Sequence, residues 1–133
     1  MNEVNRSRHA TYITNYHMVW IPKYRQRILI GAVAEETEKI LEAIAEKMEW
    51  DLIALEVMPD YIHLFVSVPP KYSPADVVKV FKGWSARHLL RKYPSLAKKR
   101  GRGTLWAPSY YVGTAGSISR ERIRRYIEEC QDK

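Results

Sequence analysis

An alternating segment near the middle of the chain, Tyr61–Val68, most constrains the fold. Every second residue in it is apolar, namely Ile62, Leu64, Val66 and Val68. The positions between them hold Tyr61, His63, Phe65 and Ser67. Because successive side chains of a strand point to opposite faces, the segment predicts a β-strand with one buried face, and Pro59-Asp60 before it predicts a turn. The chain must therefore build a sheet that is covered on one side, and the other side carries a histidine and a tyrosine.

In the rest of the chain, six further elements are predicted from the periodicity of apolar residues and from the residues that interrupt helices and strands. Alternation predicts strands over residues 9–21, 50–57 and 105–113, and helical spacing of apolar residues predicts helices over 32–48, 74–93 and 120–130. The first six elements follow the order β-α-β-β-α-β of the split βαβ, ferredoxin-like arrangement. We therefore expect one α+β domain over residues 1–133, ferredoxin-like or RRM-like. It would have a four-stranded antiparallel sheet, two helices on one face, and a C-terminal helix near the other.

The composition is that of a globular, basic protein. Hydrophobic residues make up 46%, and 22 Lys and Arg against 15 Asp and Glu give a net charge of +7. No apolar run approaches the roughly 20 residues that cross a bilayer, and the first residues lack the apolar centre of a signal peptide. The single cysteine, Cys130, is typical of a reducing compartment. We expect a cytoplasmic protein that does not bind membranes.

Basic residues gather in two loops and in the last helix, which indicates where a polyanion would bind. A strongly positive field favours nucleic acid, although charge alone fits a merely basic protein equally well. Tyr24 and Tyr110 lie beside basic residues and could stack on the bases of a single strand. The expected DNA contacts are Tyr24, Arg25, Arg27, Lys98, Lys99, Arg100, Arg102, Arg124 and Arg125.

Two residues are candidates for chemistry, and each has a structural alternative. Tyr126 could simply pack its ring at the boundary of the core, but two arginines precede it, and a basic neighbourhood favours both a phosphate and the phenolate of a nucleophile. His63 could be structural, but on a polar strand face an imidazole can help to hold a divalent metal. The other histidines, His9, His17 and His88, receive no functional assignment.

Four segments in order resemble one family. They are Tyr16-His17-Met18-Val19-Trp20-Ile21-Pro22-Lys23-Tyr24-Arg25, Met58-Pro59-Asp60-Tyr61-Ile62-His63-Leu64-Phe65-Val66, Leu105-Trp106-Ala107-Pro108-Ser109-Tyr110-Tyr111-Val112-Gly113, and Arg124-Arg125-Tyr126-Ile127-Glu128. They are similar to the signatures of the single-tyrosine HUH transposases of the insertion sequence 200/605 family. The match spans nearly the whole chain.

The resemblance implies a metal-dependent DNA-nicking and strand-transfer enzyme. Members of this family work as homodimers on single-stranded DNA hairpins at transposon ends. A tyrosine attacks the scissile phosphate and forms a 5′-phosphotyrosine intermediate, while Mg²⁺ or Mn²⁺ is held by two histidines and a glutamine. Carried over by position, Tyr126 falls on the nucleophile and His63 on the second histidine. The nucleophile helix commonly completes the partner subunit's site.

The chain departs from the family pattern at two metal positions. Tyr61 stands where the first histidine belongs, and Cys130 stands four residues after the nucleophile, where the glutamine belongs. Cysteine suits a hard cation poorly, and a neutral tyrosine is a weak ligand. Asp60, Gln131 or Glu129 could replace the missing ligand, and Asp60 with His63 is the favoured pair.

Three hypotheses about function follow. The first is a DNA transposase with Tyr126 as nucleophile and a metal near His63. The altered metal ligands support a second, a catalytically degenerate module that binds hairpin DNA or RNA on the same fold. The third is a small-molecule enzyme or regulator, because a fold alone does not fix function, but the basic loops count against it.

Overall fold

The alternating segment forms a strand, β5 (Tyr61–Ser67), at the centre of the sheet. In the computed structural model, which describes residues 5–6, 11–12, 14–99, 105–114 and 120–129, Ile62, Leu64 and Val66 have no exposed surface. Tyr61, His63 and Phe65, which alternate with them, are half-buried on the other face. The predicted division into an apolar face and a polar face is therefore confirmed for these residues.

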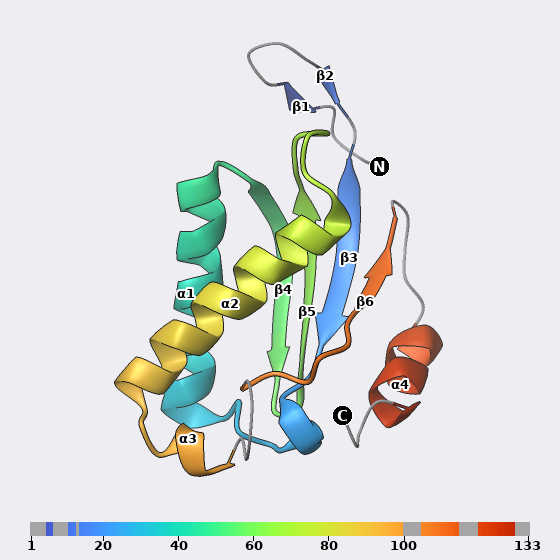
Figure 1. Cartoon of the computed structure of the whole chain (residues 1–133). Coiled ribbons are helices and arrows are strands. Elements are labelled where there is room, and N and C mark those ends of the chain that lie inside the picture. The colour runs from blue at the N-terminus through green and yellow to red at the C-terminus, as the bar shows by residue number, and fades with distance from the viewer. Residues whose placement is uncertain (1–4, 7–10, 13, 100–104, 115–119, 130–133) are drawn as a thin grey trace.

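The main sheet has four antiparallel strands in the order β4-β5-β3-β6 (Figure 1). Its other strands are β3 (Asn15–Trp20), β4 (Asp51–Met58) and β6 (Tyr111–Gly113). The first and third strands of the split βαβ unit are thus neighbours at the centre, with the second and fourth at the edges. This is the arrangement that the order of elements predicts.

Two long helices, α1 (Gly31–Met48) and α2 (Pro74–Lys92), cover one face of the sheet (Figure 1). α2 begins with a capping box, in which the Ser73 side chain accepts a hydrogen bond from the Asp76 amide and the Asp76 carboxylate accepts one from the Ser73 amide. Phe81 of α2 packs beside Trp20 of β3, with ring centroids 6.3 Å apart, and both side chains are fully buried. The main hydrophobic core lies between the helices and this face.

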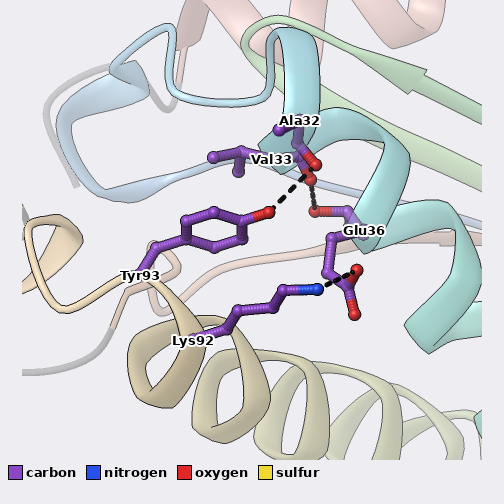
Figure 2. A network of polar contacts seen from close by, with 6 residues as sticks. Ala32, Val33, Glu36, Lys92 and Tyr93 are labelled. Atoms are coloured by element: carbon purple, nitrogen blue, oxygen red, sulfur yellow. Dashed lines mark hydrogen bonds and ion pairs between the residues drawn. The ribbon is translucent and has the colours of Figure 1, made fainter.

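Polar contacts join the C-terminal end of α2 to the N-terminal end of α1 (Figure 2). Lys92 donates a hydrogen bond of 2.8 Å to Glu36, and the Tyr93 hydroxyl lies 3.4 Å from the carbonyl oxygen of Ala32. The Lys92 contact lowers the pKa of Glu36, and the same contact raises the pKa of Lys92. These contacts fix the two helices relative to one another on the face away from α4 (Arg120–Glu129).

The opposite face of the sheet packs against α4. Tyr126 and Ile127 are buried there with Val19, Ile21 and Ala107 in a cluster separate from the main core. Val19 and Ile21 alternate along the chain with Met18 and Trp20, which belong to the main core, so the two clusters lie on opposite faces of the first strand. The described residues of α4 thus lie on the face where the C-terminal helix was expected.

Two predicted strands are shorter in the structure. β3 begins only at Asn15, because its partner β5 ends at Ser67 and Pro69-Pro70 follows it. Thr11–Tyr12 forms a separate strand, β2, which pairs with β1 (Asn5–Arg6) in a two-stranded sheet that the sequence did not predict.

The predicted strand 105–113 is reduced to its last three residues. Trp106 makes only an isolated bridge to Pro22, because Pro108 lacks the N–H group that would continue the ladder. The basic loop before it contains a short helix, α3 (Leu96–Lys99), which was also not predicted. In the part of the chain that the structure describes, none of the helices has the length and apolar character that crossing a bilayer requires.

Candidate active site

Two imidazoles meet on the sheet face that packs against α4. Antiparallel pairing sets Val19 opposite His63 and His17 opposite Phe65, so the two histidines are diagonal neighbours on one face. Nδ1 of His17 lies 3.0 Å from Nε2 of His63. The His17 ring also stacks on Phe65, with ring centroids 4.2 Å apart, and this stacking fixes the plane of the imidazole.

The second nitrogen of His63 faces a carboxylate on the edge strand. Glu56 of β4 is the direct cross-strand partner of His63, and its Oε1 lies 3.9 Å from Nδ1 of His63. The Tyr61 hydroxyl donates a hydrogen bond of 3.4 Å to the same oxygen. Tyr61, which stands where the resemblance places a histidine, is therefore directed toward Glu56.

Burial keeps His63 neutral. It lowers the pKa of His63 below its ordinary value, with His17 as the second cause, while the Glu56 carboxylate opposes the shift. A neutral imidazole offers one nitrogen lone pair, which is the form that binds a metal ion. The lowered pKa thus favours the form of His63 that can accept a cation.

Tyr126 lies on the same face, with its hydroxyl held in place. Its side chain is only 9% exposed, and its hydroxyl oxygen lies 3.2 Å from Oγ of Ser109. The Tyr111 ring packs beside it, with ring centroids 6.4 Å apart. Tyr61 also packs against the cluster that contains Tyr126, so this side chain lies between that cluster and Glu56, the carboxylate beside His63.

Lys82 fixes the segment that carries Ser109. Its ammonium group donates a hydrogen bond of 2.7 Å to the carbonyl oxygen of Ala107 and one of 3.3 Å to that of Ser109. The ring centroid of Tyr110 lies 5.9 Å from the same nitrogen. Burial lowers the pKa of Lys82 to about 8. The segment also receives support from Trp106, whose indole N–H donates to Lys82 O and Ser85 Oγ at 3.1 and 3.0 Å.

Asp60, the favoured second ligand in the sequence-based prediction, lies in the turn between β4 and β5. Its carboxylate is 3.6 Å from Nε of Arg25, so a cation bound there would compete with the guanidinium. Cys130 and Gln131, the other predicted ligands, lie outside the described residues. Glu129 ends α4 with an exposed side chain. The predicted ligand roles of these residues stay predictions.

The predicted DNA contacts lie largely at the end of the sheet where β4 turns into β5. The 3₁₀ turn Lys23–Arg25 lies there, as does α3 (Figure 1). Tyr24 and Arg25 adopt φ angles of 60° and 51°, which non-glycine residues rarely adopt. Tyr24 is 50% exposed, and Nζ of Lys23 lies 5.6 Å from the centroid of its ring.

The remaining predicted DNA contacts divide into described and undescribed residues. Arg27, Lys98 and Arg125 are exposed. Lys99 and Arg124 are described only in the backbone, and Arg100 and Arg102 lie outside the described residues. These three side chains therefore have solvent-accessible surface.

The imidazole pair can be tested for its fit to a divalent cation. Two ligands about 2.1 Å from one cation at a right angle are themselves about 3.0 Å apart. The nitrogens of His17 and His63 have that separation. Among the described residues, no group of three or more His, Cys, Asp or Glu side chains is arranged to hold a metal ion. The pair therefore fits a cation that takes its other ligands from water and phosphate, as Mg²⁺ and Mn²⁺ commonly do.

Sequence reasoning missed four residues of this site: His17, Glu56, Lys82 and Ser109. His17 was available from the alternation of its own strand, but its meeting with His63 depends on the pairing register, which a single sequence does not define. Ser109 lies in a segment without regular structure, and Lys82 appears in the sequence as one cation of an exposed helix face.

Comparison with known proteins supplies a family. The family model described as "Transposase IS200 like" matches residues 10–130. The chain is 40% identical over 131 residues to the ISDra2 transposase TnpA of Deinococcus radiodurans, covering 98% of this chain and 94% of that protein. It is 29% identical over 120 residues to the transposase for insertion sequence element IS200 of Salmonella typhimurium, covering 90% of this chain and 78% of that protein.

Solved structures give the same result. A transposase crystal structure from Deinococcus radiodurans superposes with a TM-score of 0.85 at 40% identity, covering 96% of this chain and 97% of that one. A REP-associated tyrosine transposase bound to a REP hairpin superposes with a TM-score of 0.55 at 14% identity, covering 98% of this chain and 70% of that one. The second likeness concerns the fold alone.

Proposed function

Because this chain belongs to the family of IS200-like transposases, we propose that it cleaves and rejoins single-stranded DNA at hairpin-marked transposon ends, with Tyr126 as the nucleophile. The observation that carries this proposal is the position of Tyr126. Its hydroxyl is held by Ser109 on the sheet face that also carries the pair His17 and His63. A nucleophile and a possible phosphate-polarising site thus share one face.

In the proposed reaction, the phenolic oxygen of Tyr126 forms a bond to the phosphorus of the scissile phosphodiester. The bond from phosphorus to the 3′ oxygen breaks, the phenolic proton leaves to solvent, and the departing oxygen takes up a proton to become a 3′ hydroxyl. The product is a 5′-phosphotyrosine. Attack of a 3′ hydroxyl on this link reverses the exchange and rejoins a strand, so no external energy source is required.

Ser109 and Lys82 orient the nucleophile in this scheme. The Ser109 hydroxyl is 3.2 Å from that of Tyr126 and can hold the phenol in one orientation or accept its hydrogen bond. Lys82 holds the backbone that carries Ser109 through two carbonyl oxygens. Both residues reduce the number of positions that the attacking oxygen can take, which favours reaction.

We further propose that the reaction uses Mg²⁺ or Mn²⁺ near His63. When bound, a divalent cation would neutralise charge on the scissile phosphate and so ease attack by an anionic oxygen. The neutral state of His63, which its lowered pKa favours, suits this role.

The DNA would be bound by the exposed aromatic and basic residues at the end of the sheet. Tyr24 offers a ring for base stacking, and Arg27 and Lys98 offer charges for phosphates. The solved relative that is bound to a REP hairpin supports a hairpin ligand for this fold. We also propose a homodimer, as the family resemblance implies.

The experiment is a search for a covalent protein–DNA adduct. The probe is a library of single-stranded oligonucleotides that carry an imperfect hairpin with randomised stem and flanks. The label is at the 3′ end, since the fragment downstream of the cut stays on the tyrosine. The full-length protein is incubated with this library and Mn²⁺ and then denatured. We expect a labelled band in wild type and in Tyr93→Phe, a control on the helix layer, but not in Tyr126→Phe.

The competing function is a degenerate module that binds hairpins without cutting them. Tyr61 favours this binding-only function, because it stands at a metal-ligand position of the family and its hydroxyl donates to Glu56 instead. It predicts salt-sensitive retention of hairpin oligonucleotides with no adduct in any variant, with or without Mn²⁺. That outcome would replace the transposase reaction with binding alone.

A further inference from the structure

We propose that His17 replaces the missing first histidine of the family pattern, so that a divalent cation is held between His17 on β3 and His63 on β5. The inference rests on the proposed function, because it assigns ligands to the cation of that reaction. In the family pattern the first histidine ligand would stand at position 61, two residues before His63 on β5. Here its place as a ligand would be taken by His17 on the adjacent strand, β3. Tyr61, which occupies the family's position, is then not a ligand.

The geometry of the two imidazoles supports a cation that is bound by both of them. His17 and His63 approach through Nδ1 and Nε2, the atoms that carry lone pairs in suitable tautomers, at 3.0 Å. The two rings are stacked with an inclination of 28° and centroids 5.3 Å apart. Phe65 also stacks on the His17 ring. Both rings are therefore held in place before a cation arrives.

Cation binding changes the protonation of the pair without a net loss of protons. In the hydrogen-bonded pair, one of the two facing nitrogens carries a proton. When both facing nitrogens bind the cation, each neutral ring keeps its single proton on the far nitrogen, which is Nδ1 for His63 and Nε2 for His17. The change would be a tautomer shift in one ring, relayed by solvent, with no net gain or loss of protons.

Glu56 supports the required tautomer of His63. Its Oε1 lies 3.9 Å from Nδ1 of His63, on the side away from His17. A proton on Nδ1 directed toward a carboxylate is a common arrangement for metal-bound histidines, because it orients the ring and makes the other nitrogen more basic. The Tyr61 hydroxyl donates to the same carboxylate oxygen. Tyr61 would thus be a positioning residue that acts through Glu56.

The alternative is that the two histidines make only a structural hydrogen bond between strands. Both accounts predict that loss of His17 disturbs the sheet face, so activity alone does not separate them. They differ in one observable: only the metal account places nitrogen from two imidazoles on the cation. Mn²⁺ is a suitable probe, since its magnetic coupling to ¹⁴N counts coordinated imidazoles.

The experiment titrates Mn²⁺ alone into the full-length protein, and then repeats the titration with the hairpin oligonucleotides. Electron paramagnetic resonance gives the affinity, and pulsed measurements give the nitrogen coupling. The variants are His17→Ala, His63→Ala and the control His88→Ala, which lies in a groove between α1 and α2. Circular dichroism checks that each variant folds.

We expect coupling to two imidazoles in wild type, and to one in His17→Ala. We also expect an affinity at least about tenfold weaker in His17→Ala and His63→Ala, with no change in His88→Ala. Coupling to a single imidazole in wild type, or an unchanged affinity in His17→Ala, would overturn the inference. The wild-type spectrum decides this even if a variant fails to fold.

The remaining outcomes separate this inference from the proposed function. If wild type shows two coordinated imidazoles but forms no DNA adduct, the ligand assignment stands and the proposed reaction fails. If wild type binds no Mn²⁺ with or without DNA, the ligand assignment is overturned. An adduct at Tyr126 in the presence of EDTA would then keep the nucleophile and remove the metal from the reaction.

Discussion

The ammonium group of Lys82 lies 2.7 Å from the carbonyl oxygen of Ala107, and this contact joins α2 to the segment that carries Ser109, the hydrogen-bond partner of the proposed nucleophile Tyr126. Lys82 belongs to the helix layer, whereas Ala107 belongs to the cluster around Tyr126 on the other face. The contact therefore passes around the β6 edge of the sheet. It gives the helix layer a direct role in placing Ser109, two residues further along.

Replacing Lys82 with Met should loosen this segment. The substitution removes charged hydrogen bonds to two carbonyl oxygens, of the kind that contribute about 1.5–3 kcal/mol each, although it also removes the cost of burying the charge, which lowers the Lys82 pKa, and so the net loss is smaller. We expect a destabilised protein with slower adduct formation, measured by urea unfolding and by the adduct assay. Lys79→Met on the same helix is the matched control and should change neither property.

The pKa of Lys82 predicts a pH dependence of stability. Its pKa in the folded protein is about 8, below the ordinary 10.5, so between these values the unfolded chain binds more protons at this site. The free energy of unfolding from this group therefore rises as pH increases from about 8 to about 10.5, and the contribution is lost as pH falls through 8. Subtracting the Lys82→Met curve from the wild-type curve should leave this rise. A flat difference would contradict the shifted pKa.

Removing the Ser109 hydroxyl should slow the first chemical step. In Ser109→Ala the phenol of Tyr126 loses a partner 3.2 Å away, a contact of about 1 kcal/mol. We expect adduct formation to slow by about fivefold to tenfold, with hairpin binding unchanged. Ser109→Thr keeps the hydroxyl and should retain most of the rate. Equal rates in Ser109→Ala and wild type would remove Ser109 from the reaction.

Tyr24 and Arg27 should affect DNA binding in different ways. Tyr24→Ala removes a half-exposed ring, and loss of base stacking should weaken binding by about 1–3 kcal/mol with little change in salt dependence. Arg27→Ala removes one exposed charge and should reduce the slope of log affinity against log salt by about 0.7 for a single strand. Fluorescence anisotropy at several salt concentrations measures both. If both variants bind like wild type, the DNA does not pass this end of the sheet.

Restoring the family histidine should strengthen metal binding. Residues 61 and 63 lie on one face of β5, so Tyr61→His would add an imidazole beside the pair. We expect Mn²⁺ affinity to rise by about tenfold in Tyr61→His, and to fall by no more than about threefold in Tyr61→Phe, since the hydroxyl acts on His63 only indirectly, through Glu56. A marked loss of affinity in Tyr61→Phe would make Tyr61 a ligand after all.

The periodicity of apolar residues, together with the residues that interrupt helices and strands, was enough to predict most of the fold. Alternation in Tyr61–Ser67 and helical spacing in α1 and α2 each identify a face that has to be buried, and the order of the elements matches the ferredoxin-like arrangement that buries them together. The ends of strands were predicted less well. Whether β3 continues before Asn15 depends on where its partner stops, and that is a property of the pair.

In the candidate site, too, residues in local motifs could be predicted, whereas contacts that depend on tertiary structure could not. Tyr126 and His63 could be identified because each stands in a local motif. The contact between His17 and His63 could not, because a shift of one residue in the pairing would send one ring to the other face. Lys82 was also missed, since helical period alone places it with the solvated cations of α2 and gives no sign of the carbonyl oxygens that it reaches.

The most direct measurement is mass spectrometry of the denatured reaction between the wild-type protein, Mn²⁺ and the hairpin oligonucleotides. Our account predicts one modified peptide, in which Tyr126 carries a 5′-phosphorylated DNA fragment, and no such peptide in Tyr126→Phe. A DNA fragment on any other residue, or an unmodified Tyr126 in protein that binds the hairpins tightly, would contradict it.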